Sequence, residues 1–181
     1  LLLISGVSGS GKSTLLDIIC GFKVPNNGSA LIKINGMPIS SNYCIAYSEQ
    51  EPFLIPGSLR DNITLGSSSF NINDKLINFY LANHLNDVIS SDSLLDLERV
   101  YDPEKSNLSG GQKRRVCLAR ALLTDRPIII LDEPSVGLDH KLEKFYFDLI
   151  SRVSKNKIVI LVTHSNYRAQ FSPDHVVNLS A

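Results

Sequence analysis

The sequence predicts an α/β fold built on a mostly parallel sheet with helices on both of its faces. Four short apolar runs have the length and unbroken hydrophobicity of strands buried on both sides, and they cover residues 1–4, 44–47, 128–131 and 158–162. Helical patterns separate or follow these runs, over 12–20, 111–123 and 142–153. Alternation of strands and helices is typical of a parallel sheet.

The length and charge of the chain narrow the possible classes of protein. A chain of 181 residues has the size of one domain and can bury a substantial core. Its net charge of +0 argues against a nucleic-acid partner. Its 3 cysteines lack C-x-x-C spacing, which predicts reduced core thiols in a cytosolic protein. No apolar run approaches the roughly 20 residues of a membrane span. Because the first residue already lies in a strand, we expect an excerpt of a longer protein.

A glycine-rich loop follows the first strand and matches the pattern G-x-x-x-x-G-K-[ST]. It consists of Gly6, Val7, Ser8, Gly9, Ser10, Gly11, Lys12, Ser13 and Thr14. Glycines let the backbone turn its N–H groups toward phosphate oxygens, and the following helix presents its positive end there. Lys12 adds a charge for the β- and γ-phosphates, and the Ser13 hydroxyl can bind Mg²⁺. The order strand, loop and helix predicts a P-loop NTPase, with an ordinary glycine and serine turn as the alternative.

A small antiparallel flap is predicted between the first helix and the second apolar run. A turn at 25–28, a strand over 29–34 and a second turn at 35–36 form this pattern. The strand at 44–47 then runs into polar residues that include Gln50. Open α/β sheets bind ligands just past the carboxyl ends of their strands, so these polar residues are candidates for a ligand site.

The stretch 55–107 shows no β pattern and predicts a helical insert. Apolar and aromatic residues recur there at helical spacing behind a plausible cap at Asn73, namely Ile77, Tyr80, Leu81, His84, Leu85 and Val88. Alternating helices and strands return after this insert, and 174–179 is a candidate for a last strand.

The apolar run at 128–131 ends in two carboxylates, Asp132 and Glu133. In a P-loop enzyme the first carboxylate belongs near Mg²⁺, usually through a water molecule, and the second can orient the attacking water. Glu133 is therefore the candidate general base. The alternative is a strand that merely ends in solvated acids, which the upstream glycine-rich loop disfavours.

A second candidate anion site lies at the start of the helix over 111–123. Ser109, Gly110 and Gly111 stand at its N-terminus, and three basic residues follow in its first turns. Backbone N–H groups at a helix N-terminus bind anions. Taken alone, Ser-Gly-Gly is more often a loop.

With these motifs in this order, the sequence resembles the ATP-binding cassette (ABC) ATPases over nearly its whole length. The matching motifs are the Walker A loop (6–14), the Q-loop residue Gln50, the signature (108–112), the Walker B strand (128–133), the D-loop (135–139) and the switch residue His164. The LSGGQ signature between Walker A and Walker B is highly specific. The resemblance implies a P-loop NTPase fold for one ABC ATPase domain, 1–181, with 55–107 as a helical subdomain, and ATP and Mg²⁺ as cofactors.

The resemblance also implies a partner. In the family two cassettes pair head to tail, and each ATP lies between the Walker A loop of one cassette and the signature of the other. Ser109, Gly110, Gly111 and Gln112 are therefore expected to contact ATP held by a second cassette, in a homodimer or a heterodimer. Asp139 is expected to cross the dimer interface.

The remaining roles implied by the resemblance concern hydrolysis. Gln50 is expected to approach Mg²⁺ and the attacking water, and His164 is expected to contact the γ-phosphate. A histidine that merely caps a strand end is the alternative for His164. Because Glu133 and His164 are both present, the resemblance implies a hydrolysing site, in which Lys12 and Gln50 are the other catalytic residues.

Residues 50–63 look like the segment found in exporter-type cassettes that are fused to membrane helices. The resemblance thus implies a cassette that powers export from the cytoplasmic face of a membrane, with a transmembrane domain in the same polypeptide and no nucleic-acid partner. Residues 102–107 differ from the Glu and Gly that exporters carry before the signature, and 135–137 is a less exporter-like D-loop. The alternatives are a separate importer subunit, a soluble ABC ATPase acting on ribosomes or nucleic acid, and a non-catalytic nucleotide-gated module.

Overall fold

The structure is a computed structural model of the 181 residues. It describes residues 1–40, 44–65, 67, 90–91, 94–95, 97–105, 108–136, 138, 140–163 and 172–180. Asp139, His164 and the helical pattern between 73 and 88 lie outside the described residues, so the predictions made for them remain predictions.

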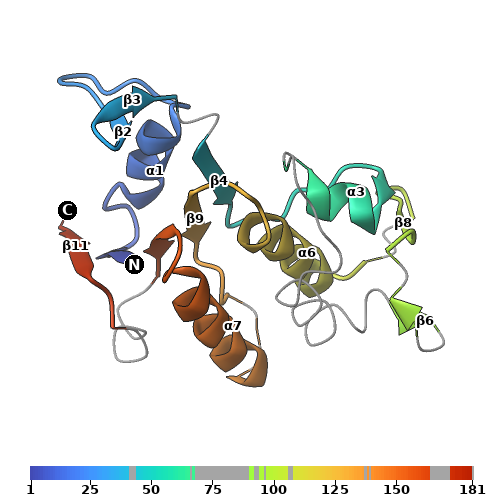
Figure 1. The fold of residues 1–181 in the computed structure, drawn as a ribbon. Coiled ribbons are helices and arrows are strands. Elements are labelled where there is room, and N and C mark those ends of the chain that lie inside the picture. Colours follow the sequence, from blue (N-terminus) through green and yellow to red (C-terminus); the bar gives the residue numbers. More distant parts are fainter. Residues whose placement is uncertain are drawn as a thin grey trace.

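A sheet of 5 parallel strands forms the centre of the molecule, in the order β11-β1-β10-β9-β4 (Figure 1). The strands are β1 (Leu2–Gly6), β4 (Ile45–Ser48), β9 (Ile128–Asp132), β10 (Ile158–Val162) and β11 (His175–Leu179). Each of the apolar runs singled out in the sequence forms one of these strands, shifted by at most one or two residues. The predicted parallel α/β fold is confirmed.

Helices cover both faces of this sheet, as predicted. The side chains of strand β9 alternate between the two faces. Ile128 and Ile130 pack in one apolar cluster with helix α1 (Lys12–Cys20), and the residues between and after them face the other side. The second cluster contains Ile129 of β9 together with helices α6 (Gly110–Leu122) and α7 (His140–Val153). A strand that is apolar at every position up to Asp132 is therefore buried between two helical layers.

The predicted flap is a two-stranded antiparallel hairpin, β2 (Ile32–Ile34) and β3 (Met37–Ile39), which is shorter than the sequence suggested. Asn35 and Gly36 connect the strands with φ angles of 52° and 81°. Two successive positive φ angles are those of the turn that Asn-Gly favours in two-residue hairpin loops.

The described part of 55–107 contains a helix, in line with the predicted helical insert, and also short strands that were not predicted. The helix is α3 (Leu59–Thr64). The strands form two antiparallel pairs, β5 (Gly57–Ser58) with β8 (Val100–Tyr101) and β6 (Ser90–Ser91) with β7 (Leu94–Leu95). The expectation that this stretch contains no strand is therefore wrong, because strands of two residues are too short to leave a periodic pattern.

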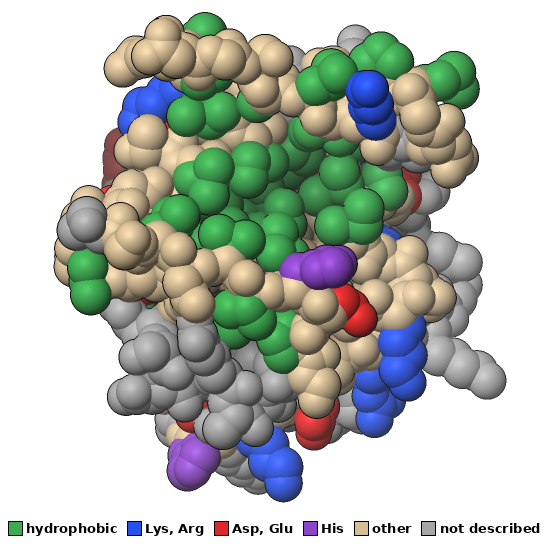
Figure 2. All heavy atoms as spheres, turned by 90° about the vertical axis from the view of Figure 1, so that its left-hand side faces the viewer, with side chains coloured by type: hydrophobic (Ala, Val, Ile, Leu, Met, Phe, Trp, Pro, Cys, Tyr) green, Lys and Arg blue, Asp and Glu red, His purple; other side chains and the backbone are tan. Residues whose placement is uncertain are grey.

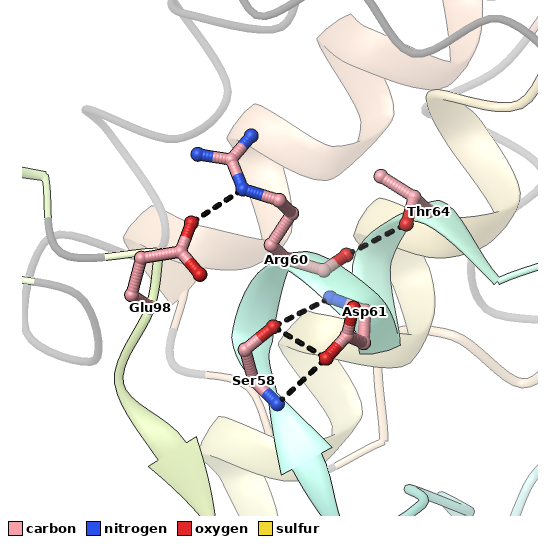
Figure 3. Close-up of polar contacts among 5 residues, drawn as sticks. All are labelled: Ser58, Arg60, Asp61, Thr64 and Glu98. Carbon is pink, nitrogen blue, oxygen red and sulfur yellow. Dashed lines mark hydrogen bonds and ion pairs between the residues drawn. The ribbon is translucent and has the colours of Figure 1, made fainter.

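Helix α3 is stabilised at its start by a capping box (Figure 3). The Asp61 backbone N–H donates to Ser58 Oγ at 3.0 Å, and Asp61 Oδ2 accepts from the Ser58 backbone N–H at 3.1 Å and from its hydroxyl at 2.7 Å. These hydrogen bonds from Ser58 lower the pKa of the Asp61 carboxyl. Arg60 Nε pairs with Glu98 Oε1 at 2.5 Å, which joins the helix to the segment before β8.

Hydrogen bonds join helix α6 to helix α3 and to the segment that precedes α3. Arg120 donates from Nε to the Asn62 carbonyl oxygen at 2.7 Å and from Nη1 to the Phe53 carbonyl oxygen at 3.0 Å. The Asn62 side chain in turn donates to the carbonyl oxygens of Ile55 and Ser58, at 2.9 and 3.0 Å. The stretch after Gln50 is thus held against the helix that carries the signature.

The cluster around α1 is more open to solvent than the cluster under α6 and α7. Figure 2 shows hydrophobic side chains gathered on the face that carries β11, α1 and the hairpin. Exposed apolar side chains on these elements and their connections are Phe22, Val24, Leu31, Met37, Val176 and Val177. All 3 cysteines are free and buried, as expected. Among the described residues, no helix is both long enough and apolar enough to cross a membrane.

Candidate functional site

The glycine-rich loop takes backbone conformations that need glycine. Gly9 and Gly11 have φ angles of 82° and 88°, and a Cβ placed on either would meet no atom within 4 Å. Backbone conformation, and not lack of space, is therefore what excludes other residues there. Gly11 is the N-cap of α1 and provides no side-chain cap, so the first N–H groups of the helix remain available to an anion.

Lys12 lies across the inside of the loop with only 8% of its surface exposed. Its Nζ donates to the carbonyl oxygens of Gly6 and Val7, both at 2.9 Å. An ammonium group has three N–H donors, so one remains for a phosphate oxygen. The loop backbone thus fixes the cation beside the unsatisfied N–H groups of α1.

A pocket of about 340 Å³ opens over the loop. Its walls bring together three motifs that are far apart in the sequence, and they consist of Ser8, Gly9, Gly11, Lys12, Ser13, Thr14, Gln50, Asp132 and Glu133. These residues follow β1, β4 and β9, whose carboxyl ends meet at one edge because the strands are parallel. Across this pocket Gln50 Nε2 donates to Glu133 Oε2 at 3.2 Å.

Asp132 is buried at the end of β9, with 7% exposure. Burial, followed by the nearby charge of Glu133, raises the pKa of its carboxyl. The Tyr47 hydroxyl donates to Asp132 Oδ2 at 3.4 Å, which favours the ionised form and opposes part of this shift. Burial also raises the pKa of the Tyr47 hydroxyl, so this group stays a donor. Sequence reasoning did not assign Tyr47 to the site.

Glu133 has a left-handed backbone conformation, with φ of 49°, although it is not glycine. Its backbone N–H donates to the Val162 carbonyl oxygen of β10 at 2.9 Å, which holds the peptide in this orientation. A positive φ at such a residue costs on the order of 1–3 kcal/mol and is concentrated at functional sites. The rest of the sheet thus maintains a strained turn that points the carboxylate at the pocket.

The signature residues lie at the start of α6, where Ser109, Gly110 and Gly111 are exposed, and they do not line this pocket. Ser109 and Gln112 form a capping box, in which the Gln112 N–H donates to Ser109 Oγ at 3.2 Å and the Ser109 N–H donates to Gln112 Oε1 at 2.8 Å. A Cβ added to Gly110 or Gly111 would meet no atom within 4 Å. Two candidate anion sites therefore exist in one chain, and the fold keeps them apart.

The pocket also suits a divalent cation that is held partly by a bound phosphate. Among the described residues, no group of three or more histidine, cysteine, aspartate or glutamate side chains could hold a metal ion. Ser13 and Asp132 instead offer two oxygen ligands beside the phosphate-binding loop. Mg²⁺ is commonly bound in this way, by one or two protein oxygens together with substrate phosphates and water.

Comparisons with known proteins agree with this arrangement. A family model described as ABC transporter matches residues 1–136. The chain is 33% identical over 171 residues to the mesentericin-Y105 transport/processing ATP-binding protein MesD of Leuconostoc mesenteroides, a match that covers 88% of the chain. It is 36% identical over 172 residues to ABC transporter B family member 17 of Arabidopsis thaliana, covering 89% of the chain.

A solved structure of a bacterial Atm1-family ABC exporter with ATP bound has a similar fold. Its TM-score is 0.78, the sequence identity is 24%, and the match covers 98% of the chain. The chain spans only 22% and 13% of the two relatives named above, and 31% of the exporter chain.

Proposed function

The chain belongs to the ABC transporter family, and from this we propose that it is an ATP-binding and ATP-hydrolysing domain that powers export across a membrane. The observation that carries the proposal is the convergence of a phosphate-binding loop, a buried aspartate and a strained glutamate on one pocket. The similar proteins, which include transport ATP-binding proteins and an ABC exporter, support the coupling to transport.

In this proposal catalysis rests on positioning and electrostatics. The α1 N–H groups and Lys12 hold the β- and γ-phosphates, and they neutralise charge as it spreads over the γ-phosphoryl oxygens. Mg²⁺, held by Ser13, the phosphates and Asp132 through water, would add charge stabilisation of the same kind. Glu133 orients and polarises the attacking water, and Gln50 keeps that carboxylate in place through their hydrogen bond.

The separation of the two anion sites supports a head-to-tail dimer. Because Ser109, Gly110 and Gly111 are exposed and lie outside the pocket of their own chain, they are free to complete the pocket of a second cassette. Open space around both glycines permits close approach of a phosphate to the α6 N-terminus. Asp139 at the dimer interface and His164 at the γ-phosphate remain parts of this proposal.

The partner proposed for transport is a transmembrane domain in the same polypeptide, with the cassette at the cytoplasmic face. Relatives four or more times as long as the matched region, among them members of the ABC transporter B family, support this arrangement. The transported substrate is expected to be selected outside the 181 residues of this chain.

The proposed function is tested with the full-length protein in lipid vesicles. We expect Mg²⁺-dependent release of phosphate from ATP that ceases when Mg²⁺ is chelated. Equal binding of ATP and ADP without turnover would instead support a non-catalytic module. Stimulation of hydrolysis by RNA, together with no association with membranes, would support the soluble alternative.

Co-expression of two inactive variants tests the head-to-tail arrangement. Lys12→Ala disables the Walker A loop and Gly111→Val the signature, so a homodimer of either variant has no intact composite site. In a mixed dimer one intact site forms, and random pairing is expected to restore hydrolysis to about a quarter of the wild-type rate. No recovery on co-expression, with both variants folded, would show that each signature serves its own chain.

Tyr47→Phe tests the polar surroundings of the proposed Mg²⁺ ligand. Loss of the hydroxyl removes a donor that favours ionised Asp132, so the pKa of Asp132 is expected to rise further above the usual aspartate value. Because only the ionised carboxylate attracts the cation, the Mg²⁺ concentration for half-maximal activity should increase about 2–5-fold. The increase should be larger at acidic pH than at neutral pH, and an equal increase at both would contradict the proposed cause.

A further inference from the structure

We propose that Arg114 is a positioning residue that couples the signature end of α6 to Gln50 and Glu133 of the same chain. This inference rests on the proposed function, because it assigns Arg114 to the catalytic site described above. It adds a residue that neither lines the pocket nor belongs to the phosphate-binding loop.

The Arg114 guanidinium holds two separate backbone segments. Its Nη2 donates to the Gln50 carbonyl oxygen at 3.1 Å, and its Nη1 donates to the Val136 carbonyl oxygen. The two segments are 64 and 22 residues away from Arg114 in the sequence. The guanidinium presents its N–H groups in a rigid planar fork, so the two carbonyls are held at a defined spacing.

Both segments lead directly to the proposed catalytic carboxylate. Gln50 donates through its own side chain to Glu133 Oε2 at 3.2 Å. On the other side, the Val136 N–H donates to the Glu133 carbonyl oxygen at 3.2 Å, which closes a turn after the strained residue. Arg114 therefore holds the residue that contacts the Glu133 side chain and also the turn that carries the Glu133 backbone.

Arg114 lies on the same helix as the signature, about one turn after it. Ser109 caps this helix, and Gly110 and Gly111 are its first residues. A helix moves as a nearly rigid rod with a rise of about 1.5 Å per residue, so any displacement at its N-terminus reaches Arg114 almost undiminished. Docking of the signature on ATP of a second cassette would thus be transmitted to Gln50 and Val136, and through them to the Glu133 carboxylate.

The test is Arg114→Gln in the full-length protein, with Arg60→Gln as the matched control. Arg60 also makes a side-chain contact, with Glu98 on the surface, but it does not line the pocket. We expect Arg114→Gln to lower kcat for ATP about tenfold, since small misplacement of catalytic groups has effects of this size. The KM for ATP and the affinity for a non-hydrolysable ATP analogue should stay within about twofold, because the phosphate-binding loop is untouched.

A second measurement tests whether Arg114 holds the segments of Gln50 and Val136 in place. Amide hydrogen exchange in the peptides that contain Gln50 and Val136 should become faster in Arg114→Gln and should stay unchanged in Arg60→Gln. A parallel loss of kcat and nucleotide affinity would indicate a general structural brace and would overturn the proposal. An unchanged kcat, or the same loss in Arg60→Gln, would also overturn it.

The experimental results would differ if the proposed function, ATP hydrolysis, were wrong. If the wild-type protein binds ATP without hydrolysing it, the catalytic assignment fails irrespective of Arg114. The exchange experiment then still decides whether Arg114 links α6 to the two segments, because it needs only the folded protein and the bound analogue.

Discussion

Replacement of Glu133 with glutamine is expected to lower the rate of ATP hydrolysis by about 10²–10³-fold. The amide has nearly the shape of the carboxylate, so the backbone turn with φ of 49° and the packing at the end of β9 should persist. It has no negative charge with which to polarise an attacking water. ATP binding should remain, because the phosphate contacts come from α1 and Lys12.

The measurement is single-turnover hydrolysis alongside binding of ATP, with Glu104→Gln as the control for loss of an exposed glutamate. Retention of ATP in the variant after dilution would show that binding and hydrolysis have been separated. A variant that hydrolyses ATP at the wild-type rate would exclude Glu133 as the general base.

Lys12→Ala is expected to have the second large effect, a loss of nucleotide affinity of about 10–100-fold. A hydrogen bond to a charged group contributes about 1.5–3 kcal/mol, which corresponds to this range. The substitution also removes the donors that hold the Gly6 and Val7 carbonyl oxygens at 2.9 Å, so the loop itself should become less ordered.

Binding of a fluorescent ATP analogue measures this loss, and Lys23→Ala is the matched control. Lys23 follows the same helix but pairs with Asp17 at 2.7 Å and does not line the pocket. Both variants lose one positive charge, so equal losses of affinity would mean that general electrostatics, and not the position of Lys12, determines binding.

The sheet and the phosphate-binding loop were predictable because their signals are local. The P-loop pattern specifies its own strand, turn and helix, and β9 is apolar at every position up to Asp132. The start of α3 was missed although Ser58 and Asp61 have the spacing of a capping box. A helix of 6 residues is too short to show a hydrophobic periodicity.

The contacts of Tyr47 and Arg114 could not be predicted from the sequence because they depend on strand pairing and helix placement. Tyr47 reaches Asp132 because it pairs in register with Ile130, and Asp132 is the next residue on that face of β9. Arg114 appeared only as one of three basic residues after the signature. The structure singles it out because its guanidinium donates to Gln50 and Val136, whereas the Lys113 ammonium lies over the Tyr101 ring.

The position of β1 in the sheet has a consequence for synthesis of the protein. Although β1 is the first strand of the chain, both of its neighbours come from the C-terminal end, since Leu2 pairs with Ile160 and His175. Such long-range parallel pairing is slow and must wait until β10 and β11 have left the ribosome. Gly6 lies so close to β11 that a Cβ there would be 2.5 Å from the Leu179 carbonyl oxygen. Capacity to bind nucleotide should therefore arise only after β10 and β11 have been made.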